Sequence, residues 1–383
     1  MMDWPNVELR EVISHRKEFV EISPGEVYSR CRVQTSSRGI VLRDRVSGSE
    51  IKTPKQQVCR TGEFLVAEID AKLGGYGIVP EELKGAIVSS HYFLFEIDED
   101  RLLRGFLDWY SRTPTFLEQV KARGSTNYAA IRPSNVLGYT IPLPSLDEQR
   151  RVVQRLDRVA ALVEERRRAI DAAERETQAL LLKAFQRAID GAPLRPMSEV
   201  APLVRRPVEI DLDGTYPELG VRSFGKGTFH KPELPGAEVG NKKLFRINAG
   251  DLLFNIVFAW EGAVAVAQPK DDGRVGSHRF LSCVPAADTA TVEFLRFYFS
   301  TREGLEKLGK ASPGGAGRNR TLGLKKLEPL NVPIPSIERQ HWFDRLQTKA
   351  REARAIRAST AQEVEDLIPA MLHEIFNGRS TAA

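Results

Sequence analysis

The sequence predicts an α+β fold that is built twice, with a long helix after each copy. Three observations support this prediction: two long helical runs, a proline-rich phrase before each run, and a nearly constant offset, 188 to 191 in the numbering, between matching stretches. The chain has 383 residues, which is enough for two domains and their connecting helices. We therefore expect two similar α/β domains in a pseudo-two-fold repeat.

The first domain is expected over residues 1–144, where short apolar stretches alternate with Gly, Pro and Ser breaks. Apolar and β-branched runs predict strands over Thr61–Ile69, Ala86–Ile97 and Val136–Ile141. Apolar residues at helical spacing predict helices over Leu102–Ser111 and Thr115–Ala122, and a short helical turn over Leu9–Ile13. Because the strands are close in sequence, we expect an antiparallel or mixed sheet.

The first long helix is expected over residues 145–191. Two prolines give an extended lead-in, Ser145 is expected to cap the helix, and Glu148 completes a capping box. Apolar residues then recur every three or four positions, at Val153, Leu156, Ala160, Val163, Ile170, Leu181, Ala184 and Ala188. A helix from 145 to 189 is roughly 65 Å long, which suits a spacer or a coiled-coil arm. The alternative is an ordinary core helix with a long tail.

The second domain is expected over residues 192–335, because it repeats the order of the first with low identity. Met197–Val200 matches Leu9–Val12 at an offset of 188 in the numbering, and Gly250 matches Gly62 at the same offset. The apolar positions are shared whereas the loops differ, so the copies share a core but not a surface.

The second long helix is expected over residues 336–379. Val332–Leu346 repeats the proline-rich phrase, in which Pro142 and Ser145 recur at an offset of 191. Its own apolar series is Leu346, Ala350, Ala353, Ile356, Thr360, Val364, Leu367 and Met371.

Composition is that of an ordinary globular protein, with 42% hydrophobic and 28% charged residues. The net charge of +5 permits a nucleic-acid partner without requiring one. The three cysteines, Cys31, Cys59 and Cys283, form no CxxC motif and are expected to be buried and reduced. The sequence shows no membrane span and no signal peptide, so we expect a cytoplasmic protein.

Two domains of similar design, each followed by a PLPSLDEQ-type phrase and a long helix, resemble the specificity (S) subunit of type I restriction–modification systems. The resemblance covers essentially the whole chain. It rests on Gly124–Thr126, on Ile141–Leu156 with the helix beyond, and on Val332–Leu346 with its helix. The second phrase has Glu338-Arg-Gln340 where the first has Asp147-Glu-Gln149.

The resemblance implies a non-catalytic DNA reader. Each domain would be a target recognition domain for one half of a bipartite, asymmetric DNA sequence. The two long helices would pack antiparallel as a coiled coil and dock two methyltransferase (M) subunits, which restriction (R) subunits join. S-adenosylmethionine, ATP and Mg would belong to those partner subunits, and this chain would hold no cofactor or metal.

Candidate DNA contacts are polar and basic residues of the variable loops, because such side chains bind phosphates or base edges. In the first domain they are Ser36, Ser37, Arg38, Arg43, Arg45, Lys72, Tyr76, Asn127 and Tyr128. In the second they are Arg222, Lys226, His230, Lys242, Lys243, Arg279, Arg318, Asn319 and Arg320. Each could instead be a solvated surface residue.

Candidate partner contacts are apolar residues of the two helical series, which should pack on each other or on methyltransferase helices. They are Leu156, Val163, Ile170, Leu346, Ala353 and Val364. Arg166–Arg168 is expected to be a solvated helix face.

Two other functions stay open from the sequence. The first is a stand-alone nuclease with a duplicated fold, for which Asp70-Ala-Lys72 could end a carboxylate–lysine motif. The second is a coiled-coil scaffold without a DNA role. His91 and His278, at similar places in the repeat, could serve as a metal ligand or base, although a locally hydrogen-bonded strand histidine is the simpler interpretation.

Overall fold

The computed structural model describes residues 4–122, 130–314 and 320–376. By the packing of its backbone, the chain divides into two compact units. Unit 1 comprises Met1–Ile170 and Ser359–Ala383, and unit 2 comprises Asp171–Ala358. The division passes through both long helices. Each unit therefore combines one predicted domain with part of each helix.

Unit 1 contains two larger sheets and one short strand pair. The antiparallel four-stranded sheet has the order β2 (Ile13–Arg16), β10 (Tyr92–Ile97), β7 (Phe64–Ala67) and β8 (Tyr76–Ile78). The five-stranded sheet has the order β3 (Val20–Glu21), β6 (Lys55–Val58), β9 (Ile87–Val88), β4 (Val27–Val33) and β5 (Ile40–Ser47). The strand pair is β1 (Asn6–Glu8) with β11 (Thr140–Pro142).

Short helices complete unit 1. They are α1 (Arg104–Ser111), α2 (Pro114–Ala122), α3 (Pro133–Leu137) and the 3₁₀ helices η1 (Leu9–Glu11), η2 (Gly48–Glu50), η3 (Asp70–Leu73) and η4 (Glu81–Leu83). The predicted helices and the turn at Leu9 are confirmed. The strand predicted over Val136–Ile141 is wrong in its first half, because α3 includes Val136 and only β11 is extended. Pro133 at the start of α3 has its φ preset for a helix, which local apolar character did not reveal.

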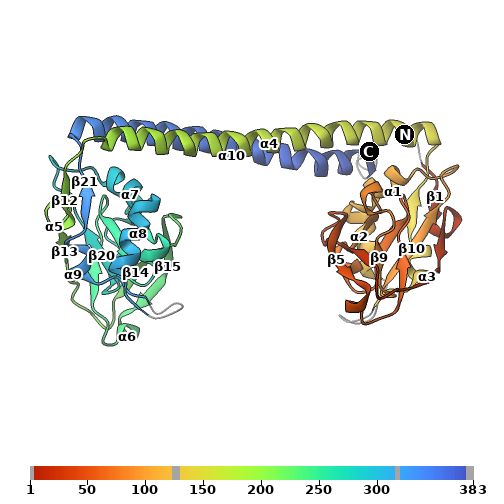
Figure 1. The fold of residues 1–383 in the computed structure, drawn as a ribbon, viewed down its shortest axis with the longest axis horizontal. Helices are drawn as coiled ribbons and strands as arrows, with labels where there is room; N and C mark the ends of the chain where they lie inside the picture. Colours follow the sequence, from red (N-terminus) through yellow and green to blue (C-terminus); the bar gives the residue numbers. More distant parts are fainter. Residues whose placement is uncertain (1–3, 123–129, 315–319, 377–383) are drawn as a thin grey trace. The chain divides into compact units, whose positions relative to one another are not determined.

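Unit 2 repeats this order of elements, except that no described strand corresponds to β3, so its second sheet has four strands. Its first sheet is β13 (Leu203–Val204), β20 (Phe280–Cys283), β17 (Leu252–Asn255) and β18 (Val264–Val266). Its second is β15 (Thr228–Pro235), β14 (Thr215–Val221), β19 (Val275–Ser277) and β16 (Leu244–Arg246), and its strand pair is β12 (Leu194–Pro196) with β21 (Asn331–Pro333). The helices are α5 (Met197–Val200), α6 (Gly236–Val239), α7 (Val292–Ser300), α8 (Arg302–Ala311), α9 (Leu324–Leu327), η5 (Ala259–Glu261) and η6 (Pro269–Asp271). Helices α7 and α8 pack together in this unit (Figure 1).

Strand register shows that the repeat is structural. In unit 1, β4 runs parallel to β9 with Arg30 opposite Ile87. In unit 2, β14 runs parallel to β19 with Glu218 opposite Val275, and both partners match those of unit 1 at an offset of 188. All other strand pairs of the two units are antiparallel among the residues that the structure describes. The predicted α+β class with a mixed sheet is therefore confirmed.

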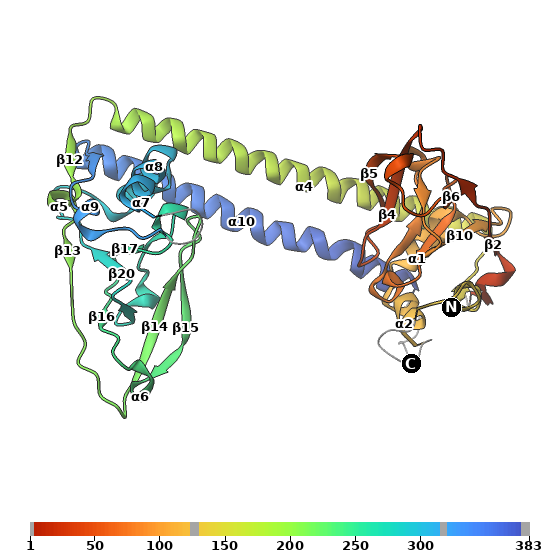
Figure 2. The same ribbon diagram turned by 60° about the horizontal axis from the view of Figure 1, so that its bottom comes forward.

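The two long helices are α4 (Leu146–Ile189), with 44 residues, and α10 (Ile337–Phe376), with 40 residues. Within each unit, a segment of α4 lies beside a segment of α10 (Figure 2). In unit 1, Arg155 pairs with Glu374 (3.4 Å) and Arg167 with Glu365 (3.5 Å). Along these pairs the residue number rises in α4 and falls in α10, so the two segments are antiparallel. The segments of unit 2 are antiparallel as well. Ser145 Oγ accepts the Glu148 N–H at 3.3 Å, which confirms the predicted cap.

An aromatic side chain near the end of each long helix packs into the core of a unit. In unit 2, Phe185 of α4 has its ring centroid 5.3 Å from that of Phe343. In unit 1, the ring centroid of Phe376 of α10 is 5.5 Å from that of Phe106. Because Phe185 and Phe376 match at the offset of 191 that relates the two helix-starting phrases, the helix ends follow the repeat as well.

A buried glutamine explains why the helix-starting phrase recurs. Gln149 accepts the Leu103 N–H (2.8 Å) through Oε1 and donates through Nε2 to the carbonyl oxygens of Arg101 (2.9 Å) and Pro144 (3.0 Å). Gln340 makes the same three bonds in unit 2, to Thr291 N, Thr289 O and Pro335 O, each at 2.9 Å. The amide thus joins the start of each long helix to the loop before α1 or α7.

The apolar residues predicted to form the packed face of α10 coincide only in part with the residues that are buried there. Phe343 and Gln347 are buried, and Arg354 and Arg357 take inward positions. Ile356 is 68% exposed. Arg354 Nε donates to Glu174 (2.9 Å) and Arg357 Nη2 to Thr177 Oγ1 (3.1 Å) in unit 2. The aliphatic part of an arginine side chain can cover apolar surface while its charged end forms an ion pair or hydrogen bond. A search for apolar residues alone therefore misses these arginines and places the packed face of α10 at the wrong positions.

No described helix is both long enough and apolar enough to cross a bilayer.

Candidate nucleic-acid interface

Each unit carries a two-stranded hairpin whose turn is held against a 3₁₀ helix. In unit 1 this is β4–β5, and Ser36 and Ser37 in its turn have φ angles of 61° and 52°. Residues with side chains seldom adopt this left-handed conformation. The N–H groups of Ser36 and Ser37 donate to the carbonyl oxygens of Leu73 (2.6 Å) and Gly74 (3.0 Å). These bonds hold a turn that leaves Ser36 and Arg38 exposed.

Unit 2 repeats this arrangement at the β14–β15 hairpin. Phe224 has a φ of 60°, and its N–H donates to the carbonyl oxygen of Glu261 at 2.8 Å. The Gly225 N–H donates to Gly262 at 3.0 Å. All four positions match their counterparts in unit 1 at the offset of 188, so the turn backbone is shared while the displayed side chains differ.

A cavity of about 320 Å³ lies beside the hairpin of unit 1. Its lining includes Arg30, Arg43, Glu50, Lys52, Gln56, Ser89 and Tyr92. Arg30 donates through Nε and Nη2 to the two carboxylate oxygens of Asp44, both at 2.7 Å. This pairing with Arg30 lowers the pKa of Asp44. The exposed Arg43 at the same cavity is one of the predicted DNA contacts.

The corresponding cavity of unit 2 is larger, at about 700 Å³. Its polar lining residues are Glu218, Ser223, Lys231, Lys242, Asn255, Ser277, His278 and Arg279, and its aromatic ones are Phe229, Phe258 and Phe280. A Cβ on Gly220 would lie 2.3 Å from the Phe229 ring, so only glycine lets this ring cross the hairpin. Lys242 and Arg279 were predicted DNA contacts, and the fold brings them together here.

The two cavities occupy equivalent places but differ in charge. At an offset of 188, Arg30 corresponds to Glu218 and Arg43 to Lys231. Ser89 and Tyr92 correspond likewise to Ser277 and Phe280. Arginine donates to guanine acceptors, whereas a carboxylate accepts from the amino groups of cytosine or adenine. The exchange of Arg30 for Glu218 thus replaces a hydrogen-bond donor with an acceptor at this position of the cavity, where Arg30 is paired with Asp44 and Glu218 lies 3.8 Å from Lys231.

His230, a predicted DNA contact, belongs to a polar cluster in the second hairpin. Its Nε2 lies 2.9 Å from Asp271 Oδ1, and Thr228 Oγ1 donates to Asp271 Oδ2 at 2.7 Å. Burial alone would raise the pKa of Asp271, but the Gln268 N–H, Thr228 and His230 outweigh that effect and lower it. Unit 1 has Ile40, Leu42 and Leu83 at the three equivalent positions.

Two predicted arginines of unit 2 lie over aromatic rings. The Arg222 guanidinium carbon is 4.7 Å from the Phe229 centroid, and that of Arg320 is 5.2 Å from Trp260. Arg320 Nη2 also donates to the Gly309 carbonyl at 3.4 Å. Such stacking orients a guanidinium without neutralising it, so the cation stays suited to a phosphate or base.

The other described candidates lie near these features without lining the two cavities. Arg45 on β5, Lys226 in the second turn and Lys243 are exposed, and Lys72 of η3 is half-buried. Asn127, Tyr128, Arg318 and Asn319, together with the turn at 124–126, lie outside the described residues.

The expectation that Tyr76 contacts DNA is wrong for this structure. Tyr76 is 1% exposed, and its ring packs 5.2 Å from Phe116 and 6.0 Å from Phe64. Burial raises the pKa of its hydroxyl to about 12. Tyr76 therefore belongs to the core. The Gly-rich sequence around Tyr76 predicts a loop, but Tyr76 begins the strand β8.

The predicted equivalence of His91 and His278 is also wrong, by one residue. Glu68 N–H donates to the His91 carbonyl (2.8 Å), and Ile256 N–H donates to the Arg279 carbonyl (2.9 Å). Ile256 lies 188 positions after Glu68, and Arg279 lies 188 positions after His91. Arg279, and not His278, is therefore the counterpart of His91. His91 Nδ1 lies 2.7 Å from Glu68 Oε2, which agrees with a locally hydrogen-bonded histidine.

The candidate partner contacts differ in how accessible they are. Leu156 is fully buried in the core of unit 1 and offers no surface to another protein. Val163, Ile170, Leu346 and Val364 are half-buried, whereas Ala353 is exposed. Contact with another protein is therefore a prediction for these five residues only.

Sequence reasoning missed Arg30, Glu218, Lys231, Asn255 and Phe224. The offset of 188 was the signal that could have found Lys231, since it is the counterpart of the predicted Arg43. Phe224 was missed because an apolar residue between two glycine-rich stretches is ordinarily assigned to a core.

Comparison with known proteins gives a likeness of fold. No protein-family model and no curated protein sequence matches the chain. A solved chain from a study of complex assembly and conformational transition of the type I R-M system is 20% identical. It has a TM-score of 0.70, with 99% of this chain and 98% of that chain covered.

The HsdS subunit of Thermoanaerobacter tengcongensis is similar as well. It is 20% identical with a TM-score of 0.56, and 98% of this chain and 97% of that chain are covered. The chain therefore has, over nearly its whole length, the fold of solved chains that include a type I restriction–modification specificity subunit.

Proposed function

We propose that this chain is the DNA specificity subunit of a type I restriction–modification complex. Unit 1 reads one half of a bipartite, asymmetric DNA target and unit 2 reads the other half. The α4–α10 pair docks two methyltransferase subunits, and restriction subunits join that assembly in the cytoplasm.

The observation that carries this proposal is the duplicated hairpin with its cavity. Each unit places cations around the same backbone feature, with Arg38 and Arg43 in unit 1 and Lys226 and Lys231 in unit 2. The backbone is shared while the charges at the cavity differ. A shared backbone with different cavity charges fits a DNA duplex that carries two different half-sites. The phosphates are the same in both half-sites, whereas the base edges differ.

In this proposal the chain itself is not an enzyme. S-adenosylmethionine, ATP and Mg act in the partner subunits, and this chain binds none of them. The nuclease alternative has no supporting cluster, since the described residues contain no group of three or more His, Cys, Asp or Glu side chains arranged to hold a metal ion.

The test is to purify the chain with its methyltransferase partner and map the adenines that the complex methylates. We expect a stable complex that methylates one split sequence, and salt-dependent binding of a duplex that carries this sequence. Mg-dependent cleavage of DNA by the chain alone, abolished by Asp70→Ala, would favour the nuclease. A chain that binds neither partner nor DNA would favour a scaffold.

A matched pair of variants assigns the half-sites. Arg43→Ala in unit 1 and Lys231→Ala in unit 2 remove equivalent cations. We expect each to weaken binding by about 1–3 kcal/mol and to relax selectivity in one half-site only. Lys270→Ala, an exposed cation outside the cavity and not a candidate contact, is the control and should leave base preference unchanged. If both variants relaxed the same half-site, the assignment of one half-site to each unit would be wrong.

A further inference from the structure

The tip of the β14–β15 hairpin carries a large apolar side chain in solvent. Phe224 is 73% exposed, whereas Phe254, Phe294 and Phe299 of the same unit are buried. The equivalent residue of unit 1, 188 positions earlier, is Ser36.

The backbone holds Phe224 in an unusual conformation. A φ of 60° is an outlier for a bulky residue and persists only where the surroundings impose it. The bonds from Phe224 N and Gly225 N to the η5 turn do this, together with the bond from Arg222 N to the Gly227 carbonyl (2.9 Å). The ring is thus carried on a braced turn.

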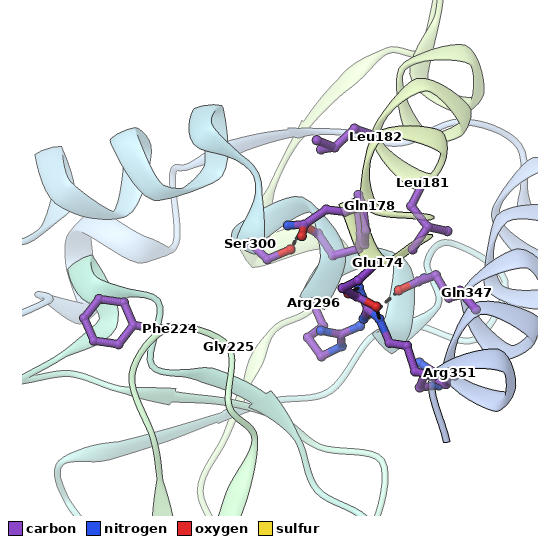
Figure 3. A pocket seen from close by; sticks show the side chains of 13 residues that line it. Glu174, Gln178, Leu181, Leu182, Phe224, Gly225, Arg296, Ser300, Gln347 and Arg351 are labelled. Carbon is purple, nitrogen blue, oxygen red and sulfur yellow. Dashed lines mark hydrogen bonds and ion pairs between the residues drawn. The ribbon is translucent and has the colours of Figure 1, made fainter. Parts of the chain in front are cut away.

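Most of the Phe224 side chain is not covered by the rest of the unit. Phe224 lines a groove of about 340 Å³ whose other walls come from α4, α7 and α10 within unit 2. Figure 3 shows its ring at the edge of this groove, away from Leu181 and Leu182 of α4. A core role would bury the ring, whereas its exposure leaves it available to a ligand.

Cations flank this ring along the turn. Lys226 is exposed two residues later, and Arg222 lies two residues earlier, stacked on Phe229. A DNA duplex offers phosphates to such cations and the apolar faces of its base pairs to an aromatic wedge. A protein groove would need acidic residues at its rim to match the two adjacent cations, whereas every step of a duplex has phosphates beside it.

We propose that Phe224 inserts at one base step of the half-site that unit 2 reads, unstacking that step and bending the duplex there. This inference rests on the proposed function. Unit 1 has no wedge, because Ser36 stands at the same braced position. The two half-sites are therefore deformed unequally, and the wedge favours easily unstacked steps at one position of the second half-site.

The test uses the full complex with the methyltransferase and duplexes carrying the target found by methylation mapping. 2-Aminopurine is placed at successive steps of each half-site, and its fluorescence reports unstacking. The variant is Phe224→Asn, since asparagine tolerates a positive φ and keeps the turn. We expect the wild-type complex to raise the fluorescence at one step of the second half-site only.

Phe224→Asn should abolish that signal and weaken DNA binding about tenfold, in the range for a lost stacking aromatic. The salt dependence of binding should stay unchanged because no phosphate contact is lost. Lys226→Ala should instead reduce the slope of log K against log salt by about one. Gly227→Asn is the matched control in the same turn, because Gly227 has a φ of 76° and an added side chain would meet no atom within 4 Å; it should change neither signal nor affinity.

Three outcomes overturn the wedge. One is a Phe224→Asn complex with unchanged fluorescence and affinity within twofold of wild type, which leaves the proposed function intact. Another is loss of methyltransferase assembly by Phe224→Asn, which assigns the ring to a protein contact. The third is an equal loss with Gly227→Asn, which assigns the effect to the turn backbone. A wild-type complex that binds no DNA refutes the proposed function itself.

Discussion

Units 1 and 2 have the same backbone but hold it together with different side chains. A buried arginine–carboxylate pair shows this. In unit 1, Arg16 binds Glu63 through two nitrogens and also donates to the Val58 carbonyl at 2.5 Å. In unit 2, Arg206 binds Asp251 at 2.6 and 3.1 Å. The two carboxylates match at the offset of 188, whereas the two arginines do not.

The carboxylate position is repeated because its task is local. Glu63 accepts the Arg60 N–H at 2.7 Å, and Asp251 accepts the equivalent Asn248 N–H at 3.1 Å. Each acid therefore closes the turn before the central strand of its sheet. The arginine only has to reach this acid, so it can come from different positions along the edge segment.

The cores also differ where the backbone is the same. Unit 1 places Cys31 and Cys59 in contact, with sulfurs 3.6 Å apart, where unit 2 has Leu219 and Ile247. The cysteines are buried, as expected, but their proximity is invisible in the sequence. The Cys31 contact and then burial raise the pKa of the Cys59 thiol, which keeps it protonated. Topology was therefore duplicated while packing chemistry diverged.

The largest expected effect comes from breaking the buried pair. Glu63→Gln should destabilise unit 1 by about 3–5 kcal/mol, because it leaves the Arg16 charge buried without its partner. Asp251→Asn should cost roughly 2 kcal/mol, since the Arg206 side chain is 26% exposed and that of Arg16 only 9%. Urea unfolding with hydrogen exchange at β7 and β17 measures both effects.

The control for this comparison is the double variant Arg16→Met with Glu63→Gln. It removes both members of the pair and should recover most of the loss. A Glu63→Gln effect below that of Asp251→Asn would show that burial does not govern the difference between the units.

An intermediate and equal effect is expected where the units agree. Gln149→Ala and Gln340→Ala each leave one N–H and two carbonyl groups without their partner, so each should cost about 2–3 kcal/mol. Thermal unfolding and exchange at the start of α4 or α10 provide the measurement. Gln186→Ala, an exposed position on α4, should change stability by less than about 0.5 kcal/mol.

The smallest effect depends on pH and is confined to unit 2. The folded pKa of Asp271 lies below its ordinary value of 3.8. Its contribution is therefore fully present above that value and is lost as the pH falls through the lower folded pKa. Asp271→Asn should cost about 1 kcal/mol at pH 7 and almost nothing in strong acid.

Urea unfolding of Asp271→Asn and wild type at several pH values measures this difference. The exposed Asp288→Asn serves as the matched control and should show no such trend. A loss of stability for Asp271→Asn that persists unchanged in strong acid would assign the effect to packing and not to charge.

Helix starts and the repeat could be predicted because their signals are local. Ser145 caps α4 as expected, since a capping hydroxyl acts on an N–H three residues away. Strand starts also recur at the offset of 188 in the structure, because the same turns precede them. The helix over Pro133–Leu137 escaped prediction because the apolar pattern indicated a strand where Pro133 presets φ for a helix. The burial of Tyr76 escaped it because that burial depends on rings far away in the sequence.

Periodicity and repetition are properties of the chain, so the amino-acid sequence was enough to establish a duplicated α+β protein with two long helices. Which polar residues meet was settled by the folding of each unit. Arg43 and Tyr92, or Lys242 and Arg279, line one cavity because strand register brings distant positions together. Register depends on backbone hydrogen bonds that almost every residue type can make, so it leaves little trace in residue identity.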